Sequence, residues 1–290
     1  MYLEIICRCF DKAAIITDDE MDKSDMENKG PRIVSSPWRL CTVTQVEEVK
    51  WLCHMIPIWI CTIFYTTAYT QVFSLFVIQG AAMDTHLGSF NVPPASLYAV
   101  DCVTVVVCIM AYNKWLMPLA RQWTGRPEGL SGLQRIGLGM PIIVLAMLEA
   151  GFVEMVRLRK RGTGGNISIL WQVPQFMTTG ISETFTYIGQ MQFFYDQAPD
   201  AMRSIGSTLT PASTALGNYL NILLVRVISR LTGNPGWIPN SGSIDMGHLD
   251  YFFFTIAILT LINFGFFCLI STGYKYIERH EISPSLPAMS

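Results

Sequence analysis

One carboxylate in the second half of the chain is placed where it could do chemistry. Glu183 is the only Asp, Glu, Lys or Arg in residues 162–195. Positions three, four and seven further along a helix share its face, and here they are Thr186, Tyr187 and Gln190. Such a polar stripe could bind a substrate amine or carry a proton. We weigh this functional interpretation above the structural one, a carboxylate paired with a neighbouring helix.

Three further residues are candidates for the same kind of site. Asp101 lies inside an apolar stretch, where it could line a cavity or cap a broken helix, and the sequence favours neither. Tyr65 and Tyr69 are four residues apart, with Thr62 and Thr66 nearby, so one helix face there suits a water-filled cavity. Aromatic residues at this spacing are, however, more often packing residues.

The sequence excludes several other kinds of chemistry. It contains no Gly-rich phosphate loop, no HExxH and no GxSxG motif, so we predict no enzyme and no catalytic residues. Cys7 and Cys9 form a lone CxC without a histidine cluster, so no metal site and no cofactor are expected. The net charge of −2 argues against a nucleic-acid partner.

The elements that must position these residues are membrane helices. Hydrophobic residues make up 51% of the 290 residues and charged residues only 14%, where globular domains carry about 25% charge. Residues 51–83 and 251–274 contain no charged residue. Such runs exceed the ~20 apolar residues that cross a bilayer as a helix. The sequence therefore predicts an integral, multi-pass membrane protein.

Six long apolar segments, each bounded by Gly, Pro or charged residues, predict an all-α fold with six transmembrane helices. We divide the chain into a partly disordered cytoplasmic linker (1–48), a six-helix bundle (49–275) and a cytoplasmic tail (276–290). The predicted spans are Val49–Gln79, Pro93–Tyr112, Arg135–Val156, Ser168–Tyr195, Ile205–Leu231 and Leu249–Tyr274.

The distribution of Lys and Arg predicts that both termini are cytoplasmic. In that orientation the N-terminal tail, the loop from Lys114 to Arg135, Arg203 and the C-terminus are inside. The cluster from Arg157 to Arg161 falls outside and opposes this assignment. We expect that it caps a helix that projects beyond the bilayer.

Several segments of the sequence resemble one family. The resemblance is to the plant nitrate/peptide transporters, proton-coupled oligopeptide transporters of the major facilitator superfamily, and within them to the di- and tripeptide branch. It runs from about residue 10 to 275. The segments that carry it are Pro37–Glu48, Pro57-Ile58-Trp59, Pro93–Leu97, Leu133–Gly137, Trp171–Gln175, Phe193–Ser204 and Gly247–Phe253, and for the peptide branch Gln79-Gly80, Met83–His86 and Asn218-Tyr219-Leu220.

The resemblance implies roles for individual residues. Glu183 matches the family's binding carboxylate, which faces the amino terminus of the peptide. Asp101 falls where bacterial relatives have a substrate-facing Asn. Tyr69 stands where a nitrate-transporting relative has a histidine that contacts nitrate, which weakens a nitrate interpretation. Gln192 departs from the family's usual Glu. The implied substrate-binding set is Glu183, Tyr69, Tyr65, Asp101, Tyr187 and Gln190.

The resemblance also implies a missing partner. The chain matches the central linker and helices seven to twelve of a twelve-helix transporter, and substrate sites in this superfamily lie between the two halves. We therefore expect proton-coupled transport of di- or tripeptides by the complete architecture, driven by a proton gradient. The expected partners are the lipid bilayer, a small peptide, and the missing six-helix bundle or a full-length relative. The location would be the plasma or vacuolar membrane.

Two alternatives remain open from the sequence. The chain could be a truncated half that does not transport but assembles with or modulates a full-length relative. It could also serve another small solute, such as nitrate.

Overall fold

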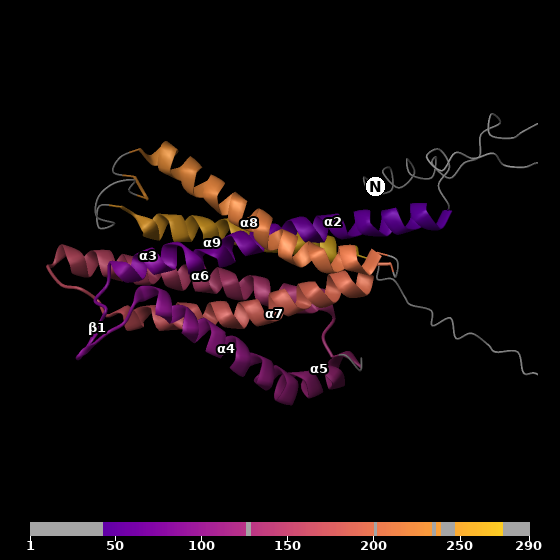
Figure 1. The fold of residues 1–290 in the computed structure, drawn as a ribbon, viewed down its shortest axis with the longest axis horizontal. Coiled ribbons are helices and arrows are strands. Elements are labelled where there is room, and N and C mark those ends of the chain that lie inside the picture. Colours follow the sequence, from indigo (N-terminus) through magenta and orange to yellow (C-terminus); the bar gives the residue numbers. More distant parts are fainter. Residues whose placement is uncertain (1–42, 126–128, 200–201, 234–235, 239–246, 275–290) are drawn as a thin grey trace, which may run out of the picture.

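The computed structural model describes residues 43–125, 129–199, 202–233, 236–238 and 247–274, and helices account for most of them. Within these ranges, six long helical segments lie roughly along the longest axis of the molecule (Figure 1). This confirms the predicted all-α fold and its six helices. Most of the predicted linker (1–48) and the predicted tail (276–290) lie outside the described residues.

The first helical segment is interrupted in its second half. It consists of α2 (Val43–Tyr69), the 3₁₀ turn η4 (Thr70–Phe73) and α3 (Leu75–Ala81). Ser74 has φ −116° and ψ −87°, outside the helical region, and separates η4 from α3. Next to the break, Gln71 donates a hydrogen bond of 2.8 Å to Asn221 on α8. The interruption thus comes directly after Tyr69, one of the candidate site residues.

The second segment is longer than predicted. It begins with η5 (Pro94–Leu97) and α4 (Tyr98–Ala111), passes through one π-helical turn, η6 (Tyr112–Leu116), and ends with α5 (Met117–Thr124). The prediction ended this span at Tyr112 and placed Lys114 in a loop, so it was wrong for the next twelve residues. The sequence pattern misled because a helix that emerges from the apolar layer becomes polar without ending.

The other four segments agree closely with the predicted spans. They are α6 (Gly132–Gly162), α7 (Val173–Gln197) preceded by η7 (Ile169–Gln172), α8 (Arg203–Thr232) and α9 (Leu249–Thr272). Ser131 starts α6 with a capping box: its hydroxyl oxygen accepts a hydrogen bond from the backbone N–H of Gln134, and the side-chain oxygen of Gln134 accepts one from the backbone N–H of Ser131.

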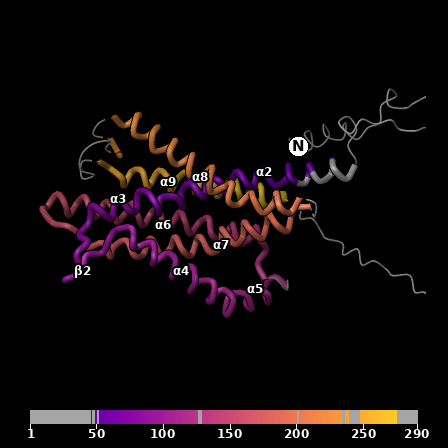
Figure 2. The backbone as a smooth tube through the Cα atoms, in the orientation of Figure 1, coloured from indigo at the N-terminus to yellow at the C-terminus, as the bar shows by residue number. Residues whose placement is uncertain are grey.

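A short antiparallel hairpin joins the first two segments. Strand β1 (His86–Leu87) pairs with β2 (Phe90–Asn91), in the register His86 to Asn91 and Leu87 to Phe90. Gly88, at φ +63°, supplies the positive φ that such a tight turn requires. Figure 2 shows the hairpin at one end of the bundle and α5 at the other.

Four of the described helical segments are long and apolar enough to cross a membrane: Leu52–Ala81, Pro94–Thr124, Gly132–Gly162 and Leu249–Thr272. With 25 and 30 residues, α7 and α8 have the required length as well. They carry more polar side chains than the other four. These two polar helices both contribute to the candidate site.

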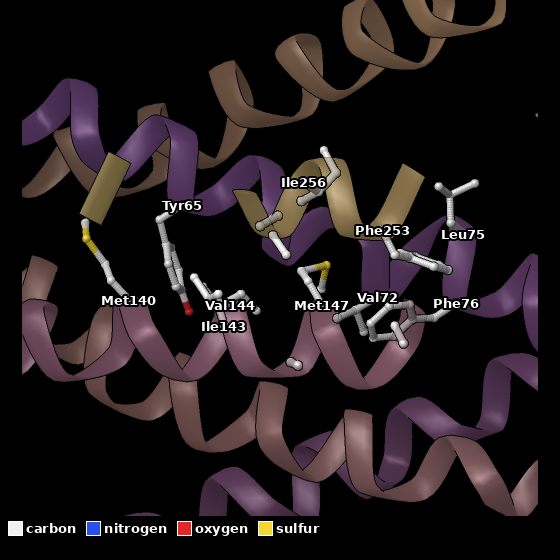
Figure 3. Packing of buried hydrophobic residues seen from close by; sticks show 14 of the residues in the cluster. Tyr65, Val72, Leu75, Phe76, Met140, Ile143, Val144, Met147, Phe253 and Ile256 are labelled. Carbon is white, nitrogen blue, oxygen red and sulfur yellow. The ribbon is translucent and has the colours of Figure 1, made fainter. Parts of the chain in front are cut away.

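The apolar core lies between α2 with α3, α6 and α9 (Figure 3). Its fully buried side chains include Phe76, Met147 and Ile143, and the Phe76 ring meets Phe253 edge-on with centroids 5.7 Å apart. Because lipid is as apolar as these side chains, close packing rather than the hydrophobic effect holds such helices together.

Small residues allow the helices to approach closely. At the crossing of α6 and α7, a Cβ atom on Gly139 would collide with Thr186, and one on Gly189 would lie 3.0 Å from the backbone nitrogen of Ile136. At the crossing of α2 and α8, a Cβ atom on Gly217 would collide with Thr66. Glycine at these positions therefore sets the spacing of the helices that surround the candidate site.

Candidate functional site

A cavity of about 460 Å³ lies between α2, α7 and α8. Its floor is buried, with Tyr65 and Thr66 exposed by only 2% and 4%, and its rim is exposed, with Tyr187 at 40%. Glu183 is the only charged side chain among the described residues that line it. The lining consists of Tyr65, Thr66, Tyr69, Glu183, Tyr187, Pro211, Thr214, Ala215 and Asn218.

Local helix geometry explains how these side chains converge. Glu183 and Tyr187 are four residues apart on α7 and so share one face, as do Tyr65 and Tyr69 on α2. Opposite them α8 presents small and polar side chains, and Gly217 lets it pack closely against α2. The predicted grouping of Glu183, Tyr65, Tyr69 and Tyr187 in one place is what the structure shows.

Glu183 has two neighbours within hydrogen-bonding reach of its carboxyl group. One is the hydroxyl of Tyr69 and the other is the carboxyl group of Asp101. Tyr98 on α4 in turn reaches the hydroxyl of Tyr69. Residues from α2, α4 and α7 therefore hold the carboxylate at the cavity wall.

Asp101 lies behind Glu183 rather than in the cavity. Its side chain is fully buried and is not among the lining residues. It sits where α4 crosses α7, since a Cβ atom on Gly180 would approach the Asp101 carbonyl oxygen to 2.8 Å. Of the two sequence alternatives, a cavity wall and a helix cap, the structure matches neither. Asp101 is instead a buried partner of Glu183.

The contact between the two carboxyl groups has a chemical consequence. In the ionised state neither carboxylate oxygen of Asp101 has a hydrogen-bond donor among the described residues. Two carboxylates side by side, one buried and one at the cavity wall, repel each other strongly, whereas one proton between them turns the contact into a hydrogen bond. The arrangement can therefore hold one proton next to the cavity.

Tyr65, at the buried floor of the cavity, links α2 to α7 and, through Ser182, to α6. Its hydroxyl and that of Ser182 are 3.0 Å apart, and Ser182 donates a bond of 2.7 Å to the Gly139 carbonyl on α6. Figure 3 shows the Tyr65 ring pointing from α2 toward α6. Tyr65 thus has a packing role in addition to its place in the cavity lining.

The predicted stripe on α7 divides into two parts. Glu183 and Tyr187 line the cavity, whereas Thr186 and Gln190 are buried, at 0% and 1% exposure, and are not among the lining residues. The Thr186 side chain lies against Gly139 of α6. No described residue forms a hydrogen bond with the amide of Gln190. A role of Gln190 in substrate binding stays a prediction.

Sequence reasoning missed a buried ionic cluster near the C-terminal end of α6. Glu154 and Arg157, exposed by 0% and 2%, form a two-pronged ion pair with N–O distances of 2.7 and 2.9 Å. Gln79 on α3 donates to Glu154 at 3.0 Å, and its own carbonyl oxygen accepts from Gln172 and Gln175 at 2.9 and 3.2 Å. The cluster joins α3, α6 and α7.

This cluster changes the interpretation of the basic segment Arg157–Arg161. Arg157 was counted among charges outside the membrane, but it is buried and paired. The family resemblance contained a signal, since Gln172 and Gln175 lie in one of the segments that carry it and Gln79 lies in a segment that points to the peptide branch. Their convergence on Glu154 could not be read from spacing.

The site offers no set of metal ligands in the described part of the chain. There, no three His, Cys, Asp or Glu side chains gather closely enough to hold an ion. The chemistry of the cavity is that of one carboxylate with hydroxyl and amide groups, which suits a ligand that donates hydrogen bonds.

Comparisons with known proteins agree on one family. The family model described as POT family (PTR2) matches residues 11–242 of this sequence. Protein NRT1/PTR FAMILY 8.1 of Arabidopsis thaliana is 44% identical over 278 residues, and the alignment covers 92% of this chain and 47% of that protein. NRT1/PTR FAMILY 7.2 of the same plant is 42% identical over 285 residues. The chain spans about half the length of the curated relatives it matches.

Solved structures support the same fold. An auto-inhibited POT family peptide transporter superimposes with a TM-score of 0.67 at 18% identity, covering 81% of this chain and 43% of that one. A POT family transporter in complex with a thioalcohol-conjugated peptide gives a TM-score of 0.56 at 16% identity and covers 93% of this chain. At these identities the similarity concerns the fold.

Proposed function

This chain belongs to the POT family of membrane transporters, and from that premise we propose that it forms one wall of a proton-coupled carrier for di- or tripeptides. The observation that supports the proposal best is the single carboxylate, Glu183, on a cavity of about 460 Å³. The cavity is large enough for a small polar ligand. A protonated peptide amine is the ligand group that such a carboxylate binds best.

The surroundings of Glu183 favour a cationic group over an anion. The residues that line the cavity in the described part of the chain include no Lys, Arg or His. Nitrate would therefore meet one negative charge and no positive charge at this wall. The named ligands of two related structures, a thioalcohol-conjugated peptide and 5-aminolevulinic acid, are likewise small organic molecules.

Asp101 supplies the coupling step in this proposal. When Asp101 and Glu183 share a proton, the pair carries one negative charge, which can balance the charge of a bound amine. Loss of that proton to the far side of the membrane leaves two carboxylates in contact, which is unfavourable. Proton movement and occupancy of the cavity would thereby affect each other.

The cavity is exposed at its rim, where Tyr187 lies, and a second set of helices packed against this rim would enclose it. In this superfamily the substrate site lies between two six-helix halves. We propose that a second bundle, supplied by a longer form of the chain or by a relative, covers the rim at Tyr187 and Asn218. A half that modulates a full-length relative would use the same surface.

Uptake of a dipeptide tests this proposal. The chain is expressed alone and as a chimaera that carries the first six helices of NRT1/PTR FAMILY 8.1, with surface expression measured for both. Proton-driven uptake by the chimaera and none by the isolated chain is the expected result. Uptake of nitrate but not dipeptide by the chimaera would contradict the substrate class.

A further inference from the structure

Two adjoining cavities lie beside the end of α4 and share no lining residue with the cavity around Glu183. The first, of about 220 Å³, contains polar groups of Tyr112, Asn113 and Arg135. The second, of about 240 Å³, is almost entirely apolar. Tyr112 and Phe185 line both, with their rings edge-on at 5.9 Å. Together they form one site with a polar part and an apolar part.

Arg135 brings a positive charge to the polar part. Its guanidinium carbon lies 4.8 Å from the centre of the Tyr112 ring. Its Cβ atom packs closely against Gly189 of α7. The buried Nε atom has no hydrogen-bond acceptor, and no ion pair joins Arg135 to another described residue. A half-buried arginine whose buried Nε has no acceptor is unusual.

Tyr112 brings a second unused donor to the same space. The side chain is 9% exposed, and no described residue forms a hydrogen bond with its hydroxyl group. Among the described residues that line the two cavities there is no Asp or Glu. A positive charge and a hydroxyl donor therefore face a space that contains no acceptor of opposite charge.

The surroundings place this site at a membrane surface. The π-helical turn η6 starts at Tyr112 and leads into α5, which lies at one end of the bundle, opposite the hairpin (Figure 1). Trp115 and Trp123 are 69% and 83% exposed, as expected for aromatic residues at headgroup level. Lys114 and Arg121 are exposed on the same segment and add positive charge.

We propose that these cavities bind one anionic phospholipid. Its phosphate would accept hydrogen bonds from Arg135 and Tyr112, and an acyl chain would lie in the apolar part beside Trp115 and Leu119. Arginine is well suited to phosphate because its guanidinium group offers paired donors. Basic pockets between membrane helices are known to take lipid headgroups. This site is independent of the transport proposed above.

A phospholipid fits better than a free phosphate ion. Inorganic phosphate would satisfy Arg135 and Tyr112 but leave about 240 Å³ of apolar space without a ligand. An amphiphile fills both parts at once. Trp115 and Leu119, exposed by 69% and 45%, border the apolar part, so a chain can enter it from the bilayer.

Fluorescence quenching measures the binding directly. The full chain is reconstituted in nanodiscs of phosphatidylcholine that contain a rising fraction of phosphatidylglycerol with brominated acyl chains, or of brominated phosphatidylcholine. Bromine quenches indole fluorescence on contact, and the difference between the wild type and Trp115→Phe isolates the signal of Trp115. We expect half-maximal quenching at a several-fold lower fraction of phosphatidylglycerol than of phosphatidylcholine.

Four substitutions test whether that preference comes from this site. Arg135→Gln should lower it about tenfold or abolish it, and Tyr112→Phe should lower it about threefold. Arg121→Gln removes the same charge from an exposed position on α5 and should change it less than twofold. Ala111→Leu, which fills the apolar part, should reduce the quenching of Trp115 by both lipids while leaving the helix content unchanged.

The opposite results would overturn the proposal. Equal quenching by both lipids, or equal effects of Arg135→Gln and Arg121→Gln, would show that no headgroup site exists. Displacement of the brominated lipid by millimolar inorganic phosphate would assign the polar part to free phosphate. Loss of quenching in the chimaera with six further helices would show that protein covers the apolar part.

Discussion

The carboxyl group of Asp101 lies fully buried against that of Glu183, which lines the cavity. The two residues come from different helices, α4 and α7, that touch closely at Gly180. Tyr69 reaches Glu183 from α2 on the other side. The candidate binding group is thus positioned by three helices, which ties its geometry to their relative arrangement.

The first prediction concerns Asp101. Asparagine can still donate a hydrogen bond to Glu183, so Asp101→Asn should keep dipeptide affinity within about threefold. Leucine cannot, so Asp101→Leu should weaken affinity about tenfold or more. Because the side chain of Asn does not titrate, Asp101→Asn should also flatten the dependence of uptake on external pH. The other ionisable groups of the described residues that interact with this pair are Tyr65, Tyr69 and Tyr98.

These values come from uptake kinetics of the chimaera with its first six helices. Equal affinity in the Asn and Leu variants would show that Asp101 does not position Glu183. An unchanged pH profile in the Asn variant would remove Asp101 from proton coupling.

The second prediction concerns the hydroxyl of Tyr69. Tyr69→Phe keeps the ring against Phe73, which it meets edge-on at 5.8 Å, and removes the hydroxyl that reaches Glu183 and Tyr98. Dipeptide affinity should fall about three- to tenfold. Tyr219→Phe is the matched control, since Tyr219 is 72% exposed and is not among the cavity-lining residues. Equal effects of the two substitutions would contradict a specific role for Tyr69.

The third prediction concerns stability. Removing one partner of a buried ion pair leaves a buried charge uncompensated and costs about 3–5 kcal/mol. Arg157→Ala and Glu154→Ala should therefore each lower the melting temperature of the detergent-solubilised chain by several degrees. Arg159→Ala, at an exposed position two residues away, should have almost no effect. Equal losses for Arg157→Ala and Arg159→Ala would contradict the buried pair.

The fourth prediction concerns topology. Burial of Arg157 in an ion pair removes one basic residue from the cluster that opposed the orientation with both termini in the cytoplasm. Tags at Met1 and Ser290 should both be protected from protease in sealed, right-side-out vesicles. Digestion of either tag would show that this orientation, or the number of spans, is wrong.

Periodicity and composition predicted the helices well because long apolar runs have few alternatives in a membrane. The end of the second segment was misplaced because Lys114 and Arg121 were assigned to a loop, although both lie on helical turns. The interruption at Ser74 was not foreseen either. Its neighbour Gln71 bonds to Asn221, 150 positions away, and no local pattern contains such a contact.

The site could be predicted only in part. Isolation in an apolar stretch made Glu183 a candidate, and helical spacing placed it on one face with Tyr187, which lines the same cavity. The same spacing also selected Gln190, whose role stays a prediction, and spacing alone does not tell that this side chain is buried outside the cavity lining. That Asp101 lies behind Glu183 depends on where α4 crosses α7, which is a property of the tertiary structure.

Dipeptide uptake by the Glu183→Gln variant of the chimaera tests the central proposal most directly. Glutamine keeps the shape of the side chain and removes the charge that would hold the peptide amine, so affinity should fall about ten- to a hundredfold. Glu149→Gln, which changes a carboxylate of α6 outside the cavity, is the matched control and should transport normally. Normal surface expression with uptake lost only in Glu183→Gln is the result we predict. Normal uptake by Glu183→Gln would contradict the account.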